Sequence, residues 1–289
     1  MNNTKKGMIY IILAAFFFAV MNVFVRMAGD LPSIQKSFFR NLIAAIFAFG
    51  ILIKNKQGFK YQQKDLPMLL LRSFFGTVGI LCNFYAVDHL LVSDASMLNK
   101  LSPFFVIICS AIFLKEKANS MQKISIIIAF IGTLFVIKPS VNFINNVNSL
   151  IGVLGALGAG VAYTCVRQLG KQGVSGPKIV FFFSCFSCLV VVPYLIFNYQ
   201  PMTLQQTLIL ILAGFMAAGG QFSITAAYNQ APGRDISIYD YSQILFAAIL
   251  GFVFLNQIPD VFSVVGYMII ILAAVASYIY QRKRMVIKD

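Results

Sequence analysis

The stretch VFSVVGYMIIILAAVASYIY at residues 261–280 decides the class of this fold, because it is twenty residues long and carries no charged side chain. An α-helix rises about 1.5 Å per residue, so a run of this length fits a bilayer core of about 30 Å. A second apolar run begins at Ile9 and continues to Val25. A transmembrane β-barrel instead has alternating segments of about ten residues. The unbroken runs therefore predict an all-α polytopic membrane protein.

The composition of the 289-residue chain excludes most other classes. Hydrophobic residues make up 59% and charged residues 11%, whereas an average soluble domain carries roughly 25% charged residues. This shortage of charge argues against a soluble enzyme, a disordered protein and a secreted disulfide scaffold. The net charge of +14 does not indicate a nucleic-acid partner, because the positive charges lie in short loops between apolar spans. The expected partner is the lipid bilayer.

Apolar runs separated by prolines and charges predict ten transmembrane helices, so the chain ends on the side of the membrane on which it begins. Seventeen Lys and Arg residues fall on the side of the termini and four on the opposite side. Cytoplasmic loops collect Lys and Arg, so we expect both termini in the cytoplasm and a plasma membrane location, the inner membrane in a bacterium. The predicted helices span residues 8–28, 35–53, 66–88, 93–114, 121–138, 149–169, 177–198, 204–228, 235–256 and 260–281.

An internal repeat relates the two halves of the chain. A constant shift in register lays Arg234–Gln257 over Ser93–Glu116 without a gap, and Phe246 then meets Phe105. Each half holds five predicted spans, an odd number, so the second half enters the membrane from the opposite side. Inverted repeats of this kind are typical of secondary transporters, in which the two halves exchange conformations to give alternating access.

Two motifs and the five-plus-five arrangement resemble a known family. FFRN at Phe38–Asn41 and LSPFFVIICSAIFLKE at Leu101–Glu116 look like the drug/metabolite transporter superfamily, and most closely its tandem EamA-type branch. The resemblance covers nearly the whole chain. It implies two EamA-like five-helix repeats, residues 1–140 and 141–289, with a central cavity between spans one to four and six to nine.

The second repeat departs from the family pattern. Pro103 and Glu116 match the fourth span of the family, whereas Ile244 and Gln257 stand at the equivalent positions of the second copy. Members of the superfamily move amino acids, S-adenosylmethionine, nucleotide sugars, small amines and other metabolites. The motifs thus imply a transporter without naming its substrate.

Polar side chains inside the predicted spans mark the candidate substrate site, because polar groups in a bilayer are costly unless they are satisfied. The repeat alignment pairs Asn99 with Asp240 and Lys100 with Tyr241. For Asn22, Asn83 and Gln221 the alternative is a hydrogen bond to a neighbouring helix. The candidate substrate-binding residues are Asn22, Asn83, Asn99, Lys100, Tyr163, Gln221, Tyr228, Asp240 and Tyr241.

Two charged residues suggest the type of substrate. At about 1.5 Å per residue, Lys100 lies about 10 Å inside span four from the outer side, and Asp240 about 8 Å inside span nine from the inner side. In a core of about 30 Å this leaves roughly 12 Å between their backbones. The gap predicts a small zwitterion, with its carboxylate toward Lys100 and its ammonium toward Asp240. Amino acids and amino-acid-like metabolites fit this description.

Several alternatives stay open for the same residues. As structural ions, Lys100 would pair with Asp88 or Asp94, and Asp240 with Arg234. In another interpretation Asp240 carries a coupling proton, because desolvation can raise the pKa of a carboxylate. In a third, it binds a substrate amine. Alternative cargoes within the same superfamily are S-adenosylmethionine, nucleotides and amines.

Small residues predict a packing face on span six. Gly152, Ala156 and Gly160 recur at four-residue spacing, which favours close approach of a neighbouring helix. Smooth contacts of this kind let helices slide past one another.

A secondary transporter of small polar metabolites is therefore the expected function. An integral-membrane enzyme that modifies lipids would need a catalytic constellation, and the one His and nine acidic residues form no cluster at ligand spacing. A channel would need a selectivity ring or filter, and none is visible in the sequence. An ATP-driven pump would need a phosphate-binding loop, and the sequence has no GxxxxGK(S/T) motif. No cofactor or metal is expected, because nothing near Cys185 and Cys188 completes a zinc site. The oligomeric state stays open between monomer and homodimer.

Overall fold

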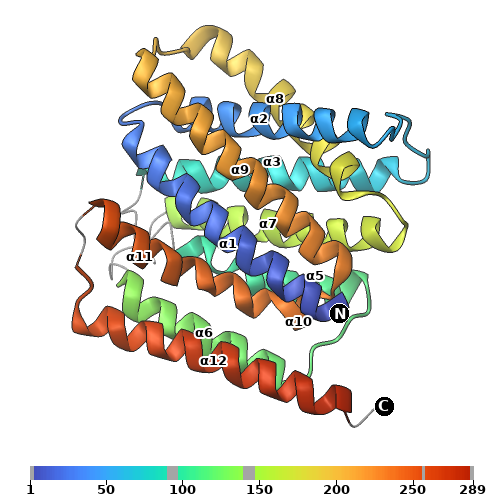
Figure 1. The fold of residues 1–289 in the computed structure, drawn as a ribbon, viewed down its shortest axis with the longest axis vertical. Helices are drawn as coiled ribbons and strands as arrows, with labels where there is room; N and C mark the ends of the chain where they lie inside the picture. Colours follow the sequence, from blue (N-terminus) through green and yellow to red (C-terminus); the bar gives the residue numbers. More distant parts are fainter. Residues whose placement is uncertain (1–2, 90–96, 139–146, 256–257, 287–289) are drawn as a thin grey trace.

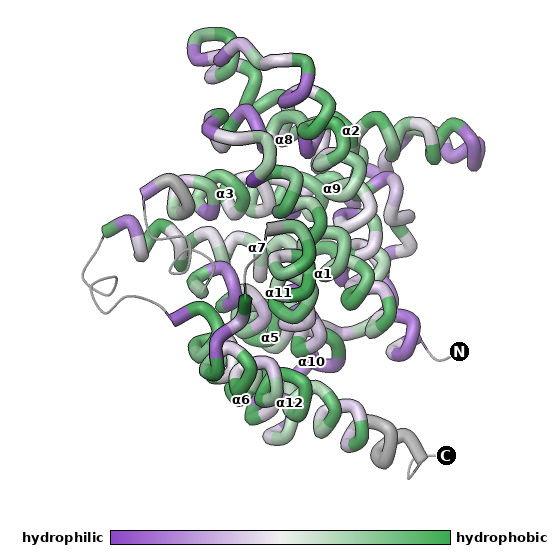
Figure 2. The backbone as a smooth tube through the Cα atoms, turned by 60° about the vertical axis from the view of Figure 1, so that its left-hand side comes forward, coloured by the Kyte–Doolittle hydropathy of each residue, from purple (hydrophilic) through white to green (hydrophobic). Residues whose placement is uncertain are grey.

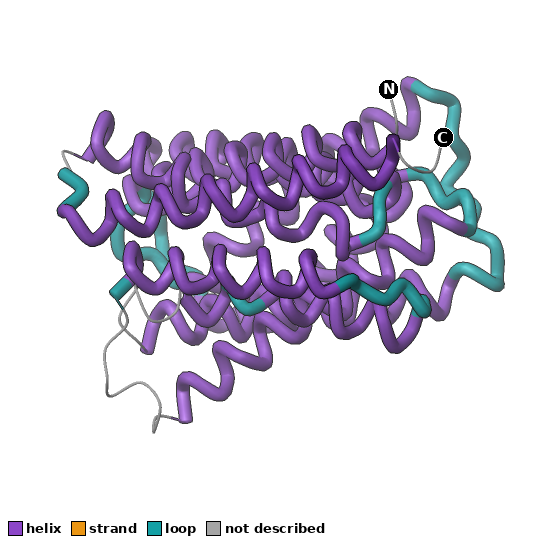
Figure 3. Tube along the Cα trace, turned by 90° about the horizontal axis from the view of Figure 1, so that it is seen from below, coloured by secondary structure: helices purple, strands orange, loops and turns teal. Residues whose placement is uncertain are grey.

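The computed structural model describes residues 3–89, 97–138, 147–255 and 258–286, which form a bundle of helices (Figure 1; Figure 3). Across these ranges the chain forms helices and connecting loops without a strand. Nine of the described helical stretches are long and apolar enough to cross a membrane, with Gly233–Phe254 counted as one stretch, and Met97–Phe113 is a shorter one. The prediction of an all-α polytopic membrane protein is confirmed.

The observed helices follow the predicted spans closely except in spans four and nine. The bounds are α1 (Asn3–Met27), α2 (Ser33–Lys54), α3 (Leu66–His89), α5 (Ser102–Phe113), α6 (Ser120–Ile137), α7 (Val147–Lys171), α8 (Gly176–Asn198), α9 (Leu204–Gln230), α10 (Gly233–Ile236), the 3-10 helix η2 (Ser237–Tyr241), α11 (Ser242–Leu255) and α12 (Val261–Val286).

Both exceptions are interruptions of a helix that was expected to be continuous. In span four, predicted at 93–114, the helical turn ends at Lys100 and α5 starts at Ser102, and the beginning of this span lies outside the described residues. Span nine, predicted at 235–256, consists of α10, η2 and α11. The repeat alignment places Lys100 on Tyr241, the last residue of η2, so the two breaks occupy equivalent positions.

The apolar surface of the bundle matches a lipid environment. Figure 2 shows hydrophobic colour along most of the helices and hydrophilic colour concentrated toward their ends. Large apolar side chains such as Ile112, Leu189 and Phe197 are 66%, 73% and 85% exposed. Because exposed patches of this extent are unfavourable in water, these outer faces are suited to contact with acyl chains.

Helix contacts repeat under the same alignment. Helix α1 packs against α9 as α7 packs against α3, and α1 contacts α11 as α7 contacts α5. Helix α2 lies against α8, and α6 against α12, so each of these pairs joins equivalent helices of the two halves. Helices far apart in the sequence therefore form the core of the bundle, and each half covers the other.

Glycines allow the closest of these approaches. A Cβ atom added at Gly158 of α7 would lie 2.8 Å from the carbonyl oxygen of Phe75 and 3.1 Å from the Cα atom of Gly79, both on α3. On another face of α7, a Cβ atom at Gly152 would lie 2.6 Å from Leu98, and one at Gly160 would lie 2.9 Å from the carbonyl carbon of Phe105. The small face predicted on span six thus packs against span four.

Both chain termini lie at the same end of the bundle, as an even number of crossings requires (Figure 1; Figure 3). We call it the terminal end. It also carries the connections at residues 55–65, 114–119, 172–175 and 231–232, whereas residues 28–32 and 199–203 connect helices at the opposite end.

Candidate functional site

The side chain of Lys100 joins the two interrupted helices. Its Nζ atom donates to Asp240 Oδ2 at 3.0 Å and to Gln243 Oε1 at 2.7 Å. The backbone carbonyl of Asp240 lies 3.4 Å from the same nitrogen. The Lys100 and Asp240 side chains are 9% and 14% exposed, so this ion pair is largely removed from the surface.

This contact corrects the predicted separation of Lys100 and Asp240. The estimate of roughly 12 Å assumed two continuous helices with independent depths, but spans four and nine meet at their breaks and bring both side chains to one level. The alternative ion pairs are not observed either. Arg234 lies 3.9 Å from Asp235 and donates to the Lys117 carbonyl. Asp94 and the Asp88 side chain lie outside the described residues.

Proline and local hydrogen bonds explain where span four breaks. Pro103 follows the break directly and, lacking an N–H, cannot continue the hydrogen-bond ladder, while its ring clashes with the carbonyl group four residues before it. In a continuous helix the Lys100 carbonyl would accept from the Phe104 N–H, which here donates to the Leu101 carbonyl at 3.0 Å. The Tyr241 hydroxyl supplies a donor to the Lys100 carbonyl instead, at 3.0 Å. Tyr241 is fully buried, so this bond is shielded from water.

Serine side chains stabilise the break in span nine. Ser237 Oγ donates to the Gly233 carbonyl at 2.6 Å, and Ser242 Oγ donates to the Tyr239 carbonyl at 2.7 Å. Such local bonds offer backbone carbonyls an alternative to the regular α-helical partner. They fit the change from α10 to the tighter 3-10 turn that holds Asp240.

Two aromatic rings from different helices lie next to this crossing. Tyr163 of α7 and Tyr228 of α9 are stacked, with ring centroids 4.9 Å apart and planes 12° apart. The Tyr228 hydroxyl lies 3.4 Å from Ser237 Oγ. The stacked pair therefore lies beside η2, the turn that carries Asp240 and Tyr241.

The remaining predicted site residues are less closely tied to this group. Gln221 is 4% exposed and donates to Thr225 on its own helix at 3.4 Å. Asn83 and Asn99 are half-buried, and Asn22 is exposed on α1. Among the described residues these three asparagines have no hydrogen bond from the side chain. Their role in binding stays a prediction.

Three polar residues within the spans were not among the predicted site residues. Gln243, one turn after Asp240, accepts from Lys100. Arg72 of α3 is 2% exposed, and its guanidinium carbon lies 3.9 Å from the ring centroid of Phe183. Arg40 of α2 lies 5.5 Å from the ring centroid of Phe18. A charged residue within an apolar span was the available signal, and for Arg72 it is a strong one.

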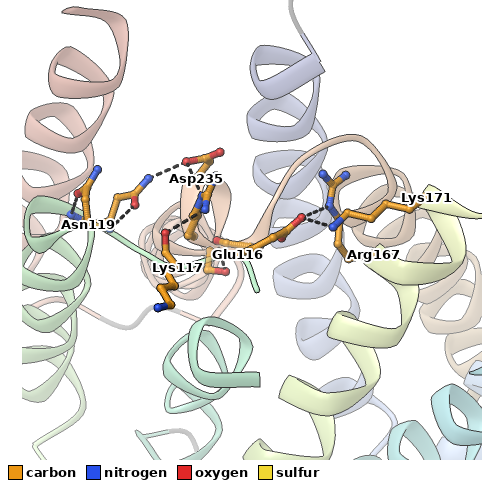
Figure 4. Close-up of polar contacts among 10 residues, drawn as sticks. Glu116, Lys117, Asn119, Arg167, Lys171 and Asp235 are labelled. Atoms are coloured by element: carbon orange, nitrogen blue, oxygen red, sulfur yellow. Dashed lines mark hydrogen bonds and ion pairs between the residues drawn. The ribbon is translucent and has the colours of Figure 1, made fainter. Parts of the chain in front are cut away.

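Charged groups at the terminal end connect the two halves of the chain (Figure 4). Glu116 Oε1, in the connection after α5, accepts from Arg167 Nε at 3.2 Å and from Lys171 Nζ at 2.6 Å, both on α7. Arg167 also donates to the Asn229 carbonyl at the end of α9 at 3.1 Å. The Glu116 and Arg167 side chains are 10% and 14% exposed, so removal of the Glu116 charge would leave the largely buried Arg167 without an anion.

A second set of bonds at this end holds α6 against α10. Gln122 Nε2 donates to Asp235 Oδ1 at 2.6 Å, and Arg234 donates to the Lys117 carbonyl at 2.9 Å (Figure 4). Gln122 also forms a capping box with Asn119 at the start of α6. Together with the Glu116 ion pairs, these bonds connect the two halves at the terminal end.

Comparison with known proteins agrees with this architecture. The chain is 31% identical to the pseudopaline exporter CntI of Pseudomonas aeruginosa over 274 residues, which is 94% of this chain and 95% of the relative. It is 25% identical to human solute carrier family 35 member G1, over 94% of this chain and 79% of the relative. These relatives are transporters rather than enzymes.

A solved structure shares the fold, and a family model matches both halves. A crystal structure with 13% sequence identity superposes with a TM-score of 0.81, covering 96% of this chain and 98% of the other. The model of the EamA-like transporter family matches residues 5–138 and again residues 148–279. The chain therefore belongs to the EamA-like transporter family, within the drug/metabolite transporter superfamily.

Proposed function

We propose that this protein is a secondary transporter of small polar metabolites that works by alternating access, with its substrate site where spans four and nine cross. The observation that carries the proposal is the Lys100–Asp240 ion pair at 3.0 Å, held between helix breaks at repeat-equivalent positions. Discontinuous helices near the membrane midplane supply unpaired backbone groups and charged side chains to substrates and coupling ions.

The repeat supplies the conformational change. We divide the chain into two five-helix repeats, residues 1–140 and 141–289, that lie inverted in the membrane. The contacts of α1 with α9 and of α7 with α3 are equivalent under this division. An exchange of conformation between the repeats would close one end of the bundle and open the other. Glu116, Arg167 and Lys171, which we call the Glu116 cluster, are placed to act as the gate of the terminal end. The distribution of Lys and Arg assigns this end to the cytoplasm.

For the substrate we propose an amino-acid-like zwitterion. Lys100 uses the Oδ2 atom of Asp240, and the described residues provide no hydrogen bond to its Oδ1 atom. A substrate ammonium group would therefore find an acceptor there, beside the stacked rings of Tyr163 and Tyr228. Asp240 thus remains the proposed partner of the substrate ammonium group. Lys100 pairs with Asp240 and is no longer the proposed partner of the substrate carboxylate.

For the direction of transport we propose export. The relative with 31% identity is an exporter, and the match covers nearly all of both chains. S-adenosylmethionine remains the second candidate substrate, because it carries the same amino-acid group.

Counterflow in proteoliposomes tests the proposed function. Vesicles preloaded with an unlabelled amino acid or S-adenosylmethionine should accumulate the same labelled compound, with saturation, and Asp240→Asn should abolish accumulation. The matched control is Asp260→Asn, which changes an exposed carboxylate in a loop. Saturable counterflow with another class of metabolite would refute the proposed substrate, and the absence of saturable counterflow for every metabolite class would refute the transporter.

A further inference from the structure

Two buried arginines are not used by the site described above. Arg72 lies seven residues into α3 and is 2% exposed, and Arg40 lies eight residues into α2 and is half-buried. Among the described residues, neither guanidinium has a carboxylate within 4.0 Å. A charge inside a membrane span without a partner is costly, so its retention points to function.

The charge balance of the interior is therefore positive. Asp240 is the one carboxylate that the described spans carry away from their ends, and it is paired with Lys100 at 3.0 Å. Arg72 and Arg40 are left without an anion. A bound anion would supply the missing counter-charge.

The surroundings of Arg72 hold the guanidinium without using its hydrogen-bond donors. Phe183 contacts the flat face of the group at 3.9 Å, and stacking on an aromatic ring leaves the edge of a guanidinium free to donate. The Arg72 Nε atom is buried and has no partner among the described residues. Gly76, one turn later on α3, makes room for the group, because a Cβ atom there would collide with Arg72 Nη1.

Other donors on the same helices also lack partners. The hydroxyl oxygens of Ser73 and Ser184, which follow Arg72 and Phe183 in the sequence, are buried without a hydrogen bond within the part of the chain that the structure describes. Buried polar groups are normally satisfied. These hydroxyl groups are further polar atoms on α3 and α8 that lack a partner within the described part of the chain.

We propose that Arg72, with Arg40 as a second cation, binds a carboxylate group of the transported substrate. The proposal rests on the proposed function and specifies the other end of the substrate: the carboxylate meets Arg72, and the ammonium group meets Asp240. A planar guanidinium matches the two oxygens of a carboxylate with parallel hydrogen bonds. Gly76 and Phe183 act as positioning residues that hold the guanidinium in place.

Ligand-induced stabilisation of the purified full-length protein tests this assignment. The probes are L-glutamate and succinate, with succinamide as the uncharged match for succinate. We expect the carboxylates to raise the Tm in a concentration-dependent way, and succinamide to leave it unchanged. Arg72→Gln should weaken carboxylate binding at least tenfold, whereas Lys138→Gln, which changes an exposed cation, should leave it at the wild-type value.

Two further variants keep the test decisive if Arg72→Gln does not fold. Gly76→Ala retains the charge but displaces the guanidinium, and Arg40→Gln removes the second cation; both should raise the Kd for succinate. Equal stabilisation by succinate and succinamide, no stabilisation by either carboxylate, or a wild-type Kd in these variants would overturn the proposal. Counterflow of an amine that lacks a carboxylate would then leave the transporter intact and refute only the anion site.

Discussion

The hydroxyl group of Tyr241 donates to the backbone carbonyl of Lys100 at 3.0 Å, although the two residues are 141 positions apart. This separation equals the shift that aligns the two halves, so Tyr241 and Lys100 are equivalent residues, and one donates to the backbone of the other. In the opposite direction, Lys100 Nζ lies 3.4 Å from the carbonyl of Asp240, the residue before Tyr241. The two breaks therefore stabilise each other, and a change at one is transmitted to the other.

Loss of the Tyr241 hydroxyl should destabilise the crossing. In Tyr241→Phe the Lys100 carbonyl loses its donor in a buried setting, which costs about 1–3 kcal/mol. We expect a lower unfolding temperature and slower transport. Tyr194→Phe is the control, because Tyr194 is 43% exposed on α8. Equal unfolding temperatures for Tyr241→Phe and wild type would show that the bond does not stabilise the break.

Lys100 and Asp240 should behave as an energetically coupled pair. Removal of one partner of a buried ion pair costs about 3–5 kcal/mol, because the other charge remains buried and unpaired. We therefore expect Lys100→Met and Asp240→Asn each to lower the stability strongly, and the double variant to be no less stable than either single variant. Thermal unfolding of the four proteins measures the coupling. Strictly additive effects would mean that the two side chains are independent.

The Glu116 cluster should control opening of the terminal end. Glu116→Gln removes the anion between Arg167 and Lys171, so the closed arrangement of this end loses two ion pairs. We expect a Thr225→Cys thiol, at a position that is 1% exposed on α9, to be alkylated several-fold faster in the Glu116→Gln background. An unchanged alkylation rate would argue against a gating role.

Asp260 provides a contrasting ion pair at the opposite end. It pairs with Lys138, and hydrogen bonds from Lys138 and from the Ser263 backbone lower the pKa of this exposed carboxyl to about 2. A lowered pKa in the folded state contributes stability above about pH 4 that is lost as the pH falls toward 2. The difference in Tm between wild type and Asp260→Asn should hence be small and constant from pH 5 to pH 8. A difference that grows across this range would contradict the lowered pKa.

The close contact between α7 and α5 should be sensitive to volume. A Cβ atom at Gly160 would lie 2.9 Å from the Phe105 carbonyl carbon and 3.1 Å from the Val106 nitrogen, so Gly160→Ala must move α5. We expect slower transport with normal membrane insertion. The control is Gly50→Ala, because nothing lies within 4 Å of that position. Equal transport by both variants would show that α5 adapts freely.

Much of the fold could be predicted from the sequence. The length of each apolar run indicates a spanning helix, since backbone groups in lipid must be satisfied within the helix. The number of such runs then predicts the number of helices. The constant offset between the two halves anticipated which helices are equivalent. The two breaks were missed because apolar periodicity does not report backbone hydrogen bonding. A proline follows the break in span four, but span nine has no proline at its break.

The sequence selected several residues that the structure brings together, but it did not predict their geometry. Lys100, Asp240 and Tyr241 were selected as polar groups within spans, and the structure brings them together. Their distance could not be obtained from depth along separate helices, because the crossing of the two spans depends on contacts between residues more than a hundred positions apart. Arg72 was not among the predicted site residues, because the sequence does not show that its guanidinium lacks a partner.

Accessibility of Gln243 from both sides of the membrane tests the central claim most directly, because this side chain contacts Lys100 at 2.7 Å. The measurement uses a Gln243→Cys variant in a background in which the five native cysteines are replaced, and a membrane-impermeant thiol reagent applied to vesicles of either orientation. An alternating-access site at the crossing of spans four and nine predicts labelling from each side in turn, with protection by substrate from both. Labelling from one side alone, in a variant that still transports, would contradict the account.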